Sequence, residues 1–168
     1  MNETTGKTTR TTQQAAPREV TVSRTIAAPA ERVWGLISDV TRIGEWSPET
    51  TSCTWLGAAT GPATGARFAG TNSRSGKTWR TVCTVIECEP GARFGFDVKG
   101  GPFKVANWSY RIVANGEACT VHETWTDQRG RIVTKLGKRV SGVTDRAEHN
   151  RSGMEATLAN LATSAEAG

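Results

Sequence analysis

Apolar and polar side chains alternate along the chain from Val20 onward. Val20, Val22 and Ile26 are interleaved with Ser and Thr, which is the period-two pattern of a half-buried β-strand. This pattern predicts a first strand that ends near Ala27. Further strands are predicted at 50–58, 66–74, 77–88, 92–98, 103–114 and 118–128.

Turn-forming sequences separate the six later strands. They are Gly61-Pro62, Ser75-Gly76, Pro90-Gly91, Gly100-Gly101-Pro102 and Asn115-Gly116. Strands joined by short turns pair antiparallel, because a parallel pair needs a crossover of a dozen or more residues. The pattern therefore predicts a seven-stranded antiparallel sheet.

Helical periodicity replaces alternation between the first and second strands. Pro29 favours a first helical turn, and Val33, Leu36, Ile37 and Val40 follow at helical spacing. A second helical turn is predicted over 39–46, and Ser47-Pro48 ends it because proline disfavours helical geometry in the residue before it.

A long helix is predicted at the C-terminal end. Asp145 is a suitable N-cap with Glu148 as its reciprocal partner, and Met154, Leu158 and Leu161 form one apolar stripe, so the helix should reach about Leu161. The preceding segment, 132–140, has apolar residues at helical spacing but is interrupted by glycines. It is expected to be either irregular or separately capped.

Composition favours one domain over residues 18–168. Residues 1–17 contain six Thr and almost no apolar bulk, which predicts a disordered tail. No apolar run suits a secretory signal or a membrane span, so a cytoplasmic protein is expected. Monomer and homodimer both remain open.

Cysteine spacing and charge add little to the function. Cys53, Cys83, Cys88 and Cys119 lack the spacing of zinc ligands and are expected to be buried thiols. The net charge of +5 would assist an encounter with acidic partners without identifying one.

Several segments together resemble a known family. They are IAAPAERVWGLISD at 26–39, GEWSP at 44–48, VIECEPGARFGF at 85–96 and RSGMEATLANL at 151–161. In this order they resemble the START-like superfamily, and more narrowly the bacterial polyketide cyclase/dehydrase and lipid-transport proteins, also called SRPBCC proteins. The resemblance covers about residues 19–163.

The resemblance implies an α+β helix-grip fold, in which the sheet wraps around the long C-terminal helix and a hydrophobic cavity lies between them. Members include lipid carriers, aromatase/cyclases that close polyketide chains, and a few growth-inhibiting toxins. The family therefore predicts the fold but does not identify a reaction.

Strand alternation predicts which side chains line that cavity. The six Trp of the chain and its other aromatic residues would form rigid, amphipathic walls, and Trp46 should lie near the mouth. The candidate ligand-binding residues are Trp46, Phe68, Asn72, Trp79, Phe94, Phe96, Trp108, Tyr110, Glu123, Trp125, Met154 and Leu158.

Glu123 is the anomaly in this set. It shares a strand face with Val121 and Trp125, so a carboxylate is predicted to point inward, where it must find a partner, stay protonated or meet water. One interpretation is a polar anchor or proton-transfer group, with Glu123 and Tyr110 as candidate catalytic residues. The competing interpretation is a Glu at the open mouth or paired with Arg24 or Arg80.

Other chemistry finds no support in the sequence. His122 and His149 lack metal-ligand spacing and are interpreted as surface residues, and no nucleophile elbow or phosphate-binding loop occurs. No metal or cofactor is expected. The basic run Arg129, Arg131, Lys135, Lys138 and Arg139 is interpreted as a solvated face, and nucleic acid is not expected as a partner.

Three functions remain open. The first is binding or carrying a small hydrophobic ligand, a lipid or a polyketide-like molecule. The second is an aromatase/cyclase-type enzyme that uses Glu123 and Tyr110. The third, a toxin-like regulator of growth, is supported only by the basic run and by analogy.

Overall fold

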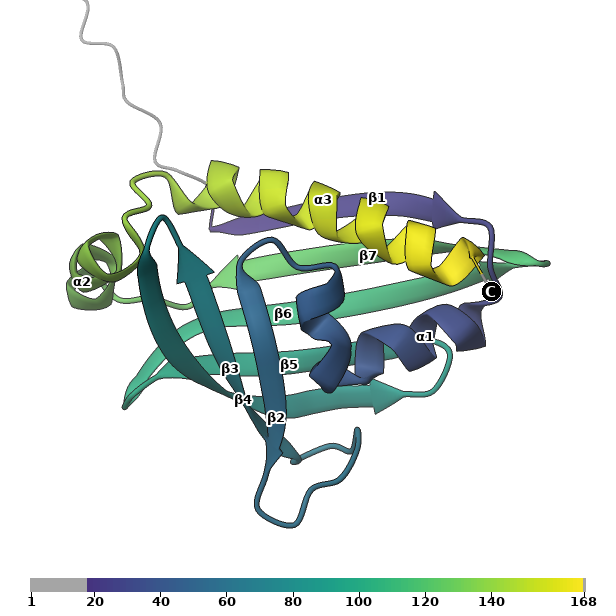
Figure 1. Ribbon diagram of the computed structural model, residues 1–168, viewed down its shortest axis with the longest axis horizontal. Coiled ribbons are helices and arrows are strands. Elements are labelled where there is room, and N and C mark those ends of the chain that lie inside the picture. The colour runs from purple at the N-terminus through teal and green to yellow at the C-terminus, as the bar shows by residue number, and fades with distance from the viewer. Residues whose placement is uncertain (1–17, 168) are drawn as a thin grey trace, which may run out of the picture.

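The computed structural model describes residues 18–167, and in it seven strands and three α-helices build a helix-grip fold (Figure 1). The tail predicted at 1–17 lies outside the described residues. In chain order the elements are β1 (Glu19–Ile26), α1 (Ala30–Ser38), the 3₁₀-helix η1 (Val40–Glu45), β2 (Thr50–Leu56), β3 (Arg67–Arg74), β4 (Lys77–Glu89), β5 (Arg93–Gly100), β6 (Phe103–Asn115), β7 (Ala118–Asp127), α2 (Arg131–Ser141) and α3 (Arg146–Glu166).

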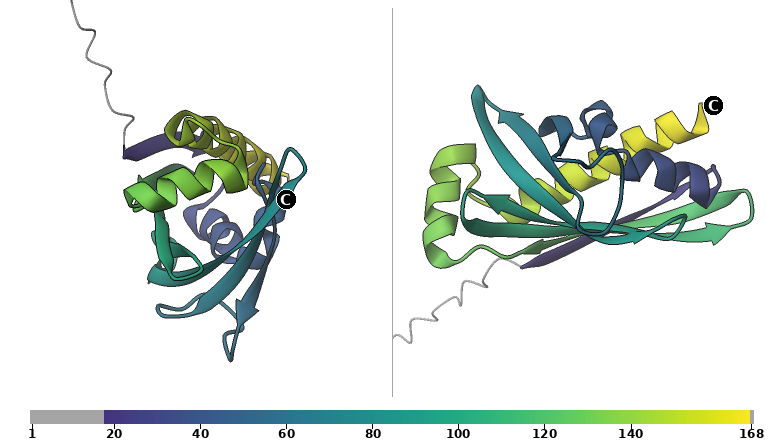
Figure 2. Two further views of the ribbon diagram at one scale, coloured as in Figure 1. Left: turned by 90° about the vertical axis from the view of Figure 1, so that its left-hand side faces the viewer. Right: turned by 90° about the horizontal axis from the view of Figure 1, so that it is seen from below.

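The strands form one antiparallel sheet in the order β1-β7-β6-β5-β4-β3-β2. β1 does not pair with β2, the next strand along the chain. It pairs with β7, which places Val22 opposite Glu123. On the other side of β7, Glu123 lies opposite Tyr110 of β6. The sheet curls strongly, and register shifts in β4 and between β5 and β6 add to the bend (Figure 2).

α3 lies along the concave face of the sheet. The Asp145 side chain accepts a hydrogen bond from the Glu148 backbone N–H at 3.1 Å, as predicted for the N-cap. No reciprocal bond from the Glu148 side chain occurs among the described residues. The helix runs to Glu166, whose Oε1 accepts from the Ala27 backbone N–H at 2.9 Å, so it extends past Leu161.

The core lies between α3, α1 and the sheet. α3 packs mainly on β1, whereas α1 packs on α3, β5 and β6. The apolar stripe of α3 is fully buried at Met154, Leu158 and Leu161. The concave surface of the middle strands is therefore not covered directly by α3.

The segment 132–140, expected to be either irregular or separately capped, forms α2. The segment is a helix with its own C-cap, Gly142, which adopts a left-handed φ of 70° and donates its N–H to the Lys138 carbonyl.

Arg129, counted with the solvated basic run, instead bonds Asp127 at 2.8 Å and its side chain is only 10% exposed. In residues 18–167 no helix combines the length and apolarity that crossing a membrane requires.

The two glycines of the first helical region have opposite steric environments. A Cβ on Gly44 in η1 would collide with the Thr51 carbonyl oxygen, whereas a Cβ on Gly35 in α1 would meet open space. Gly44→Ala should lower the free energy of unfolding by about 1–3 kcal/mol. Gly35→Ala, the matched control, should raise it by about 0.5–1 kcal/mol through helix propensity. Chemical denaturation measures both, and equal effects would contradict the close approach of η1 to β2.

Candidate functional site

A cavity of about 450 Å³ lies between the concave face of the sheet and the N-terminal half of α3. Its lining residues come from η1, β2 to β7, α2 and α3. In residues 18–167, three large apolar side chains of the lining are exposed, and two of them, Leu136 and Val140, belong to α2, whereas the third, Phe103, begins β6. We therefore place the mouth at the α2 end of the molecule.

The cavity contains most of the residues predicted to face it. Phe94 and Leu158 are the exceptions, because they are buried in the core and do not line the cavity. Whether the remaining residues contact a ligand stays a prediction. The predicted residues that line the cavity are Trp46, Phe68, Asn72, Trp79, Phe96, Trp108, Tyr110, Glu123, Trp125 and Met154.

Trp46 has a different position from the one expected. It is only 3% exposed, and its backbone carbonyl accepts a hydrogen bond from Asn160 of α3 at 3.1 Å. The prediction that it lies near the mouth was wrong, because the turn after η1 folds inward against α3. Trp46 forms an inner wall instead.

Aromatic rings from β2, β3 and β5 form a rigid part of the wall. Phe68 and Phe96 meet edge-to-face with ring centroids 5.2 Å apart, and Trp55 packs on Phe68 in the same manner at 5.6 Å. Such edge contacts restrict the rings beyond what area burial alone achieves. The wall is thus apolar and preformed.

Glu123 points into this apolar cavity, as strand alternation predicted. Its side chain is 2% exposed. The Tyr110 hydroxyl, on the neighbouring strand, donates a hydrogen bond of 2.9 Å to Glu123 Oε1. The other oxygen, Oε2, is buried and has no hydrogen-bond partner in the described residues.

Burial determines the protonation of this pair. Loss of solvation raises the pKa of Glu123 to about 8, and the hydrogen bond from Tyr110 opposes the rise only in part. Burial and the neighbouring carboxyl together hold the pKa of Tyr110 well above its usual range. At neutral pH Glu123 is mostly a neutral carboxylic acid with an available O–H donor.

The partner of Glu123 is therefore not an arginine. Neither Arg24 nor Arg80 forms an ion pair with it in residues 18–167, and both are exposed. The prediction that either arginine could pair with Glu123 was wrong, because the register of β6 against β7 places Tyr110 directly opposite.

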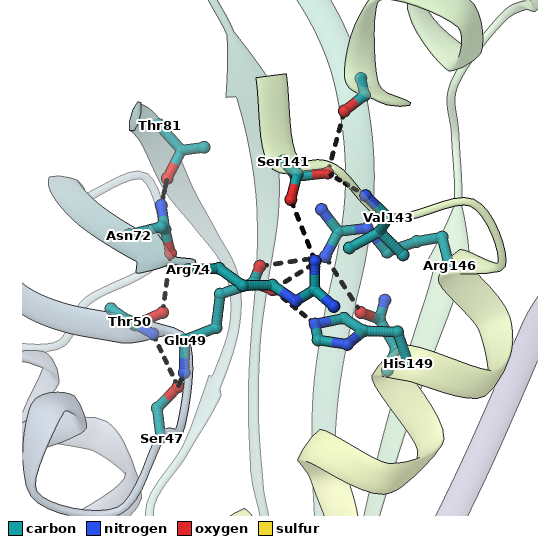
Figure 3. A network of polar contacts seen from close by, with 12 residues as sticks. Ser47, Glu49, Thr50, Asn72, Arg74, Thr81, Ser141, Val143, Arg146 and His149 are labelled. Carbon is teal, nitrogen blue, oxygen red and sulfur yellow. Dashed lines mark hydrogen bonds and ion pairs between the residues drawn. The ribbon is translucent and has the colours of Figure 1, made fainter. Parts of the chain in front are cut away.

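A second polar cluster, drawn in Figure 3, lines the cavity near β2, at the opposite edge of the sheet from Glu123. Glu49, just before β2, accepts from Nη1 of Arg146 at 3.0 Å and lies 2.7 Å from Nε2 of His149. Arg146 and His149 belong to the first turns of α3, so the cluster ties β2 to this helix. All three residues line the cavity.

Asn72 continues the polar lining on β3. Its Oδ1 accepts from Thr50 at 2.9 Å, and its Nδ2 donates to Thr81 at 3.3 Å. The side chain is buried with both ends of its amide satisfied. Asn72 therefore stabilises the wall between β2 and β4 and leaves less capacity for a ligand than Glu123 does.

Glu49, Arg146 and His149 were not among the predicted site residues. The interpretation of His149 as a surface residue was wrong, since its side chain is only 28% exposed and is bonded to Glu49. Extending the Met154 stripe back by helical spacing reaches Asn150 and Ala147, which are buried, so the stripe gives no signal for His149; its contact with Glu49 depends on tertiary packing. His122 does lie on the outer face of β7, away from this cavity.

The cysteines are mostly buried thiols, as expected. Cys53 and Cys83 line the cavity, and burial raises their pKa values to about 11 and about 12 respectively. They are neutral thiols at physiological pH. Cys119 is also buried, whereas Cys88 is only partly so.

The elevated pKa of Glu123 predicts a pH dependence of stability. Its pKa is higher in the folded state than the ordinary value of about 4.3 expected on unfolding, so stability is greatest below that value and falls as pH rises towards 8. The fall reaches at most about 1.4 kcal/mol per pH unit. Thermal or urea unfolding measures the free energy of unfolding between pH 5 and pH 8. It should fall less over this range in Glu123→Gln than in the parent protein.

Glu117→Gln is the matched control, because Glu117 is exposed on the turn between β6 and β7. It should keep the pH dependence of the parent chain. A parent-like fall with pH in Glu123→Gln would contradict the protonated carboxyl.

The fold and its chain order match known structures. The solution structure of the Polyketide_cyc-like protein Cgl2372 from Corynebacterium glutamicum is 31% identical over 91% of this chain and 94% of that one, with a TM-score of 0.61. A START superfamily protein from Mycobacterium smegmatis is 18% identical, with 88% and 97% covered and a TM-score of 0.62.

DynU16, from the dynemicin biosynthetic locus, is 19% identical over 90% of this chain and 48% of its own, with a TM-score of 0.63. No curated protein sequence matches the chain. The family model described as "Polyketide cyclase / dehydrase and lipid transport" matches residues 17–166. The chain therefore belongs to the polyketide cyclase/dehydrase and lipid-transport family and has the helix-grip fold.

Proposed function

We propose that this protein binds a small, largely apolar molecule that presents one carbonyl or hydroxyl group to Glu123. The observation that carries the proposal is the unpartnered, buried Oε2 of Glu123 in a cavity lined mainly by apolar side chains. A neutral carboxylic acid at this point donates a hydrogen bond, and an unsatisfied buried donor costs about 1–3 kcal/mol. A ligand acceptor, or water when the ligand is absent, would remove that cost.

The cavity volume supports binding rather than a simple packing defect. At about 24 cal/mol for each Å³, a dry cavity of this size would cost about 11 kcal/mol. That figure approaches or exceeds the entire stability of a typical domain, about 5–15 kcal/mol. The cavity is therefore expected to hold water or a ligand, and its volume falls in the ordinary range for small-molecule sites, about 300–1,000 Å³.

The distribution of polar groups indicates how a ligand would be oriented. Glu123 and Tyr110 lie on β7 and β6, whereas Glu49, Arg146 and His149 lie across the cavity at β2 and α3. The aromatic wall of Phe68 and Phe96 separates these two polar regions along the sheet order. A neutral lipid or a polyketide-like aromatic molecule with a carbonyl or hydroxyl at one end fits this arrangement.

A matched pair of fluorescent probes tests the proposal. Pyrene and 1-pyrenemethanol differ by one hydroxymethyl group, and the parent protein should bind the alcohol about tenfold more tightly through Glu123. The double variant Tyr110→Phe, Glu123→Met removes both polar groups without leaving either unpaired, so it should still bind pyrene but show no preference. Fluorescence titration measures the dissociation constants.

Equal affinity of the parent protein for both probes would contradict the role of Glu123. An apolar binding cavity would be contradicted if neither pyrene nor 1-pyrenemethanol bound the parent protein or raised its melting temperature.

A second function, an aromatase/cyclase-type reaction, is favoured by the same pair for a different reason. A carboxyl with a pKa of about 8 is suited to proton transfer near neutral pH, and Tyr110 holds it in place at 2.9 Å. With a polyketide-like substrate, Glu123 would move a proton during enolisation or dehydration.

Glu123→Gln separates the two functions. This variant keeps the shape of the side chain and its hydrogen bond from Tyr110 but cannot transfer a proton, so it should bind the substrate normally and lose turnover by at least a hundredfold. Single-turnover assays with an aromatic polyketide substrate measure the rate. Full activity in the variant would exclude Glu123 as the proton-transfer group.

A further inference from the structure

The amphipathic helix α2 leaves much of its apolar arc in solvent. Ile132 is 72% exposed, and Leu136 and Val140 are each 48% exposed. An amphipathic helix normally buries this arc against the protein core. The exposed arc of α2 therefore has no partner in the described part of the chain.

These side chains cluster at the cavity mouth. Phe103, at the first position of β6, is 47% exposed and lines the cavity together with Leu136 and Val140. The other large apolar side chains exposed within residues 18–167, Ile86 and Val113, lie on β4 and β6 away from α2. The mouth is thus the place where exposed apolar side chains gather.

The same helix carries a dense positive charge. Arg131, Lys135, Lys138 and Arg139 occupy the helical arc adjacent to Ile132, and α2 contains no acidic residue. None of the four forms an ion pair with a described residue. Cations and apolar side chains therefore lie side by side on one exposed surface.

The neighbouring turns extend the positive charge. On the turn between β3 and β4, Lys77 donates to the Arg139 carbonyl at 2.8 Å and Arg74 donates to the Ser141 carbonyl at 3.2 Å. These bonds hold the C-terminal end of α2. Lys99 and Lys104 flank the turn between β5 and β6. This turn, the turn between β3 and β4, and α2 all lie at the end of the molecule opposite α1 (Figures 1 and 2).

We propose that this end of the molecule docks on a bilayer containing anionic phospholipids, with Ile132 and Leu136 entering the headgroup region. The docking surface, called the mouth face below, consists of α2 and the turns 74–77 and 99–104. A helix with apolar side chains flanked by Lys and Arg suits a membrane interface, where burial of apolar area and attraction to anionic lipids add together.

The mouth face lies at the open end of the cavity, so docking would orient the cavity relative to the bilayer. Because the mouth lies beside α2, the docked protein would turn its cavity towards the acyl chains of the bilayer. A nucleic acid partner would use the cations alone, because phosphate contacts gain nothing from Ile132. Charge and exposed apolar area together therefore favour a lipid surface.

Vesicle co-sedimentation of the full chain tests the proposal and needs no cavity ligand. The protein should sediment with vesicles made of equal parts phosphatidylcholine and phosphatidylglycerol, and much less with phosphatidylcholine alone. Raising the salt concentration should weaken binding to the anionic vesicles, because a few tenths molar salt screens charges beyond roughly 5–8 Å.

Two variants separate the apolar and ionic parts of the contact. Ile132→Gln should weaken partitioning about tenfold, since a buried Ile side chain is lost from the interface. Lys135→Gln combined with Lys138→Gln should weaken it by about tenfold or more. Their matched controls are Ile86→Gln and the pair Arg24→Gln, Arg32→Gln, which change exposed residues outside the mouth face and should leave partitioning unchanged.

The substituted side chains are exposed, so thermal melting should show that all four proteins remain folded. Absence of binding to anionic vesicles would overturn the proposal. The proposal would also be overturned if the control pair Arg24→Gln, Arg32→Gln weakened binding as much as the lysine pair, or if Ile132→Gln had no effect. Either result would show adsorption through net charge. Retention of duplex DNA in place of vesicles would assign the mouth face to a nucleic acid instead.

Discussion

A single α-helix cannot cover the concave face of a seven-stranded sheet, and the remaining architecture depends on this constraint. Seven strands at about 4.8 Å spacing span roughly 29 Å, whereas one helix with its side chains is about 10 Å wide. α3 packs mainly on β1 at one edge, and α1 and η1 fill one end. The cavity occupies the space left over the middle strands, and α2 lies beside its open end.

Glu123 acquires its properties from this arrangement. It lies on β7, next to the strand that α3 covers, and faces the cavity instead of the core. Apolar surroundings favour the neutral carboxyl, and the register with β6 brings the Tyr110 hydroxyl to one oxygen while leaving the other without a partner. Burial, sheet register and the incomplete cover of the sheet together make one polar group available to a ligand.

Much of the fold could be predicted from residue patterns because those patterns report local geometry. Alternation along β6 and β7 correctly placed Tyr110 and Glu123 on the inner face. The family resemblance correctly indicated the helix-grip fold. Each of these inferences depends on neighbours within a strand or on the order of elements.

The errors concern contacts between distant segments. An arginine partner was one of the alternatives considered for Glu123, but strand register determines which side chain lies opposite, and that is Tyr110. Glu49 and His149 are 100 residues apart and meet only because β2 approaches the first turns of α3. The glycines around α2 obscured its helical character, although Gly142 is the cap that ends it. Such pairings depend on tertiary packing, which periodicity does not report.

Carboxyl ¹³C NMR, with the Glu123 resonance assigned by comparison with Glu123→Gln, measures the protonation of this buried carboxyl most directly. We expect this carbon to titrate with a pKa near 8, and at neutral pH we expect 1-pyrenemethanol to shift its resonance more than pyrene does. An ordinary carboxyl pKa near 4.3, with no response to either probe, would contradict both expectations.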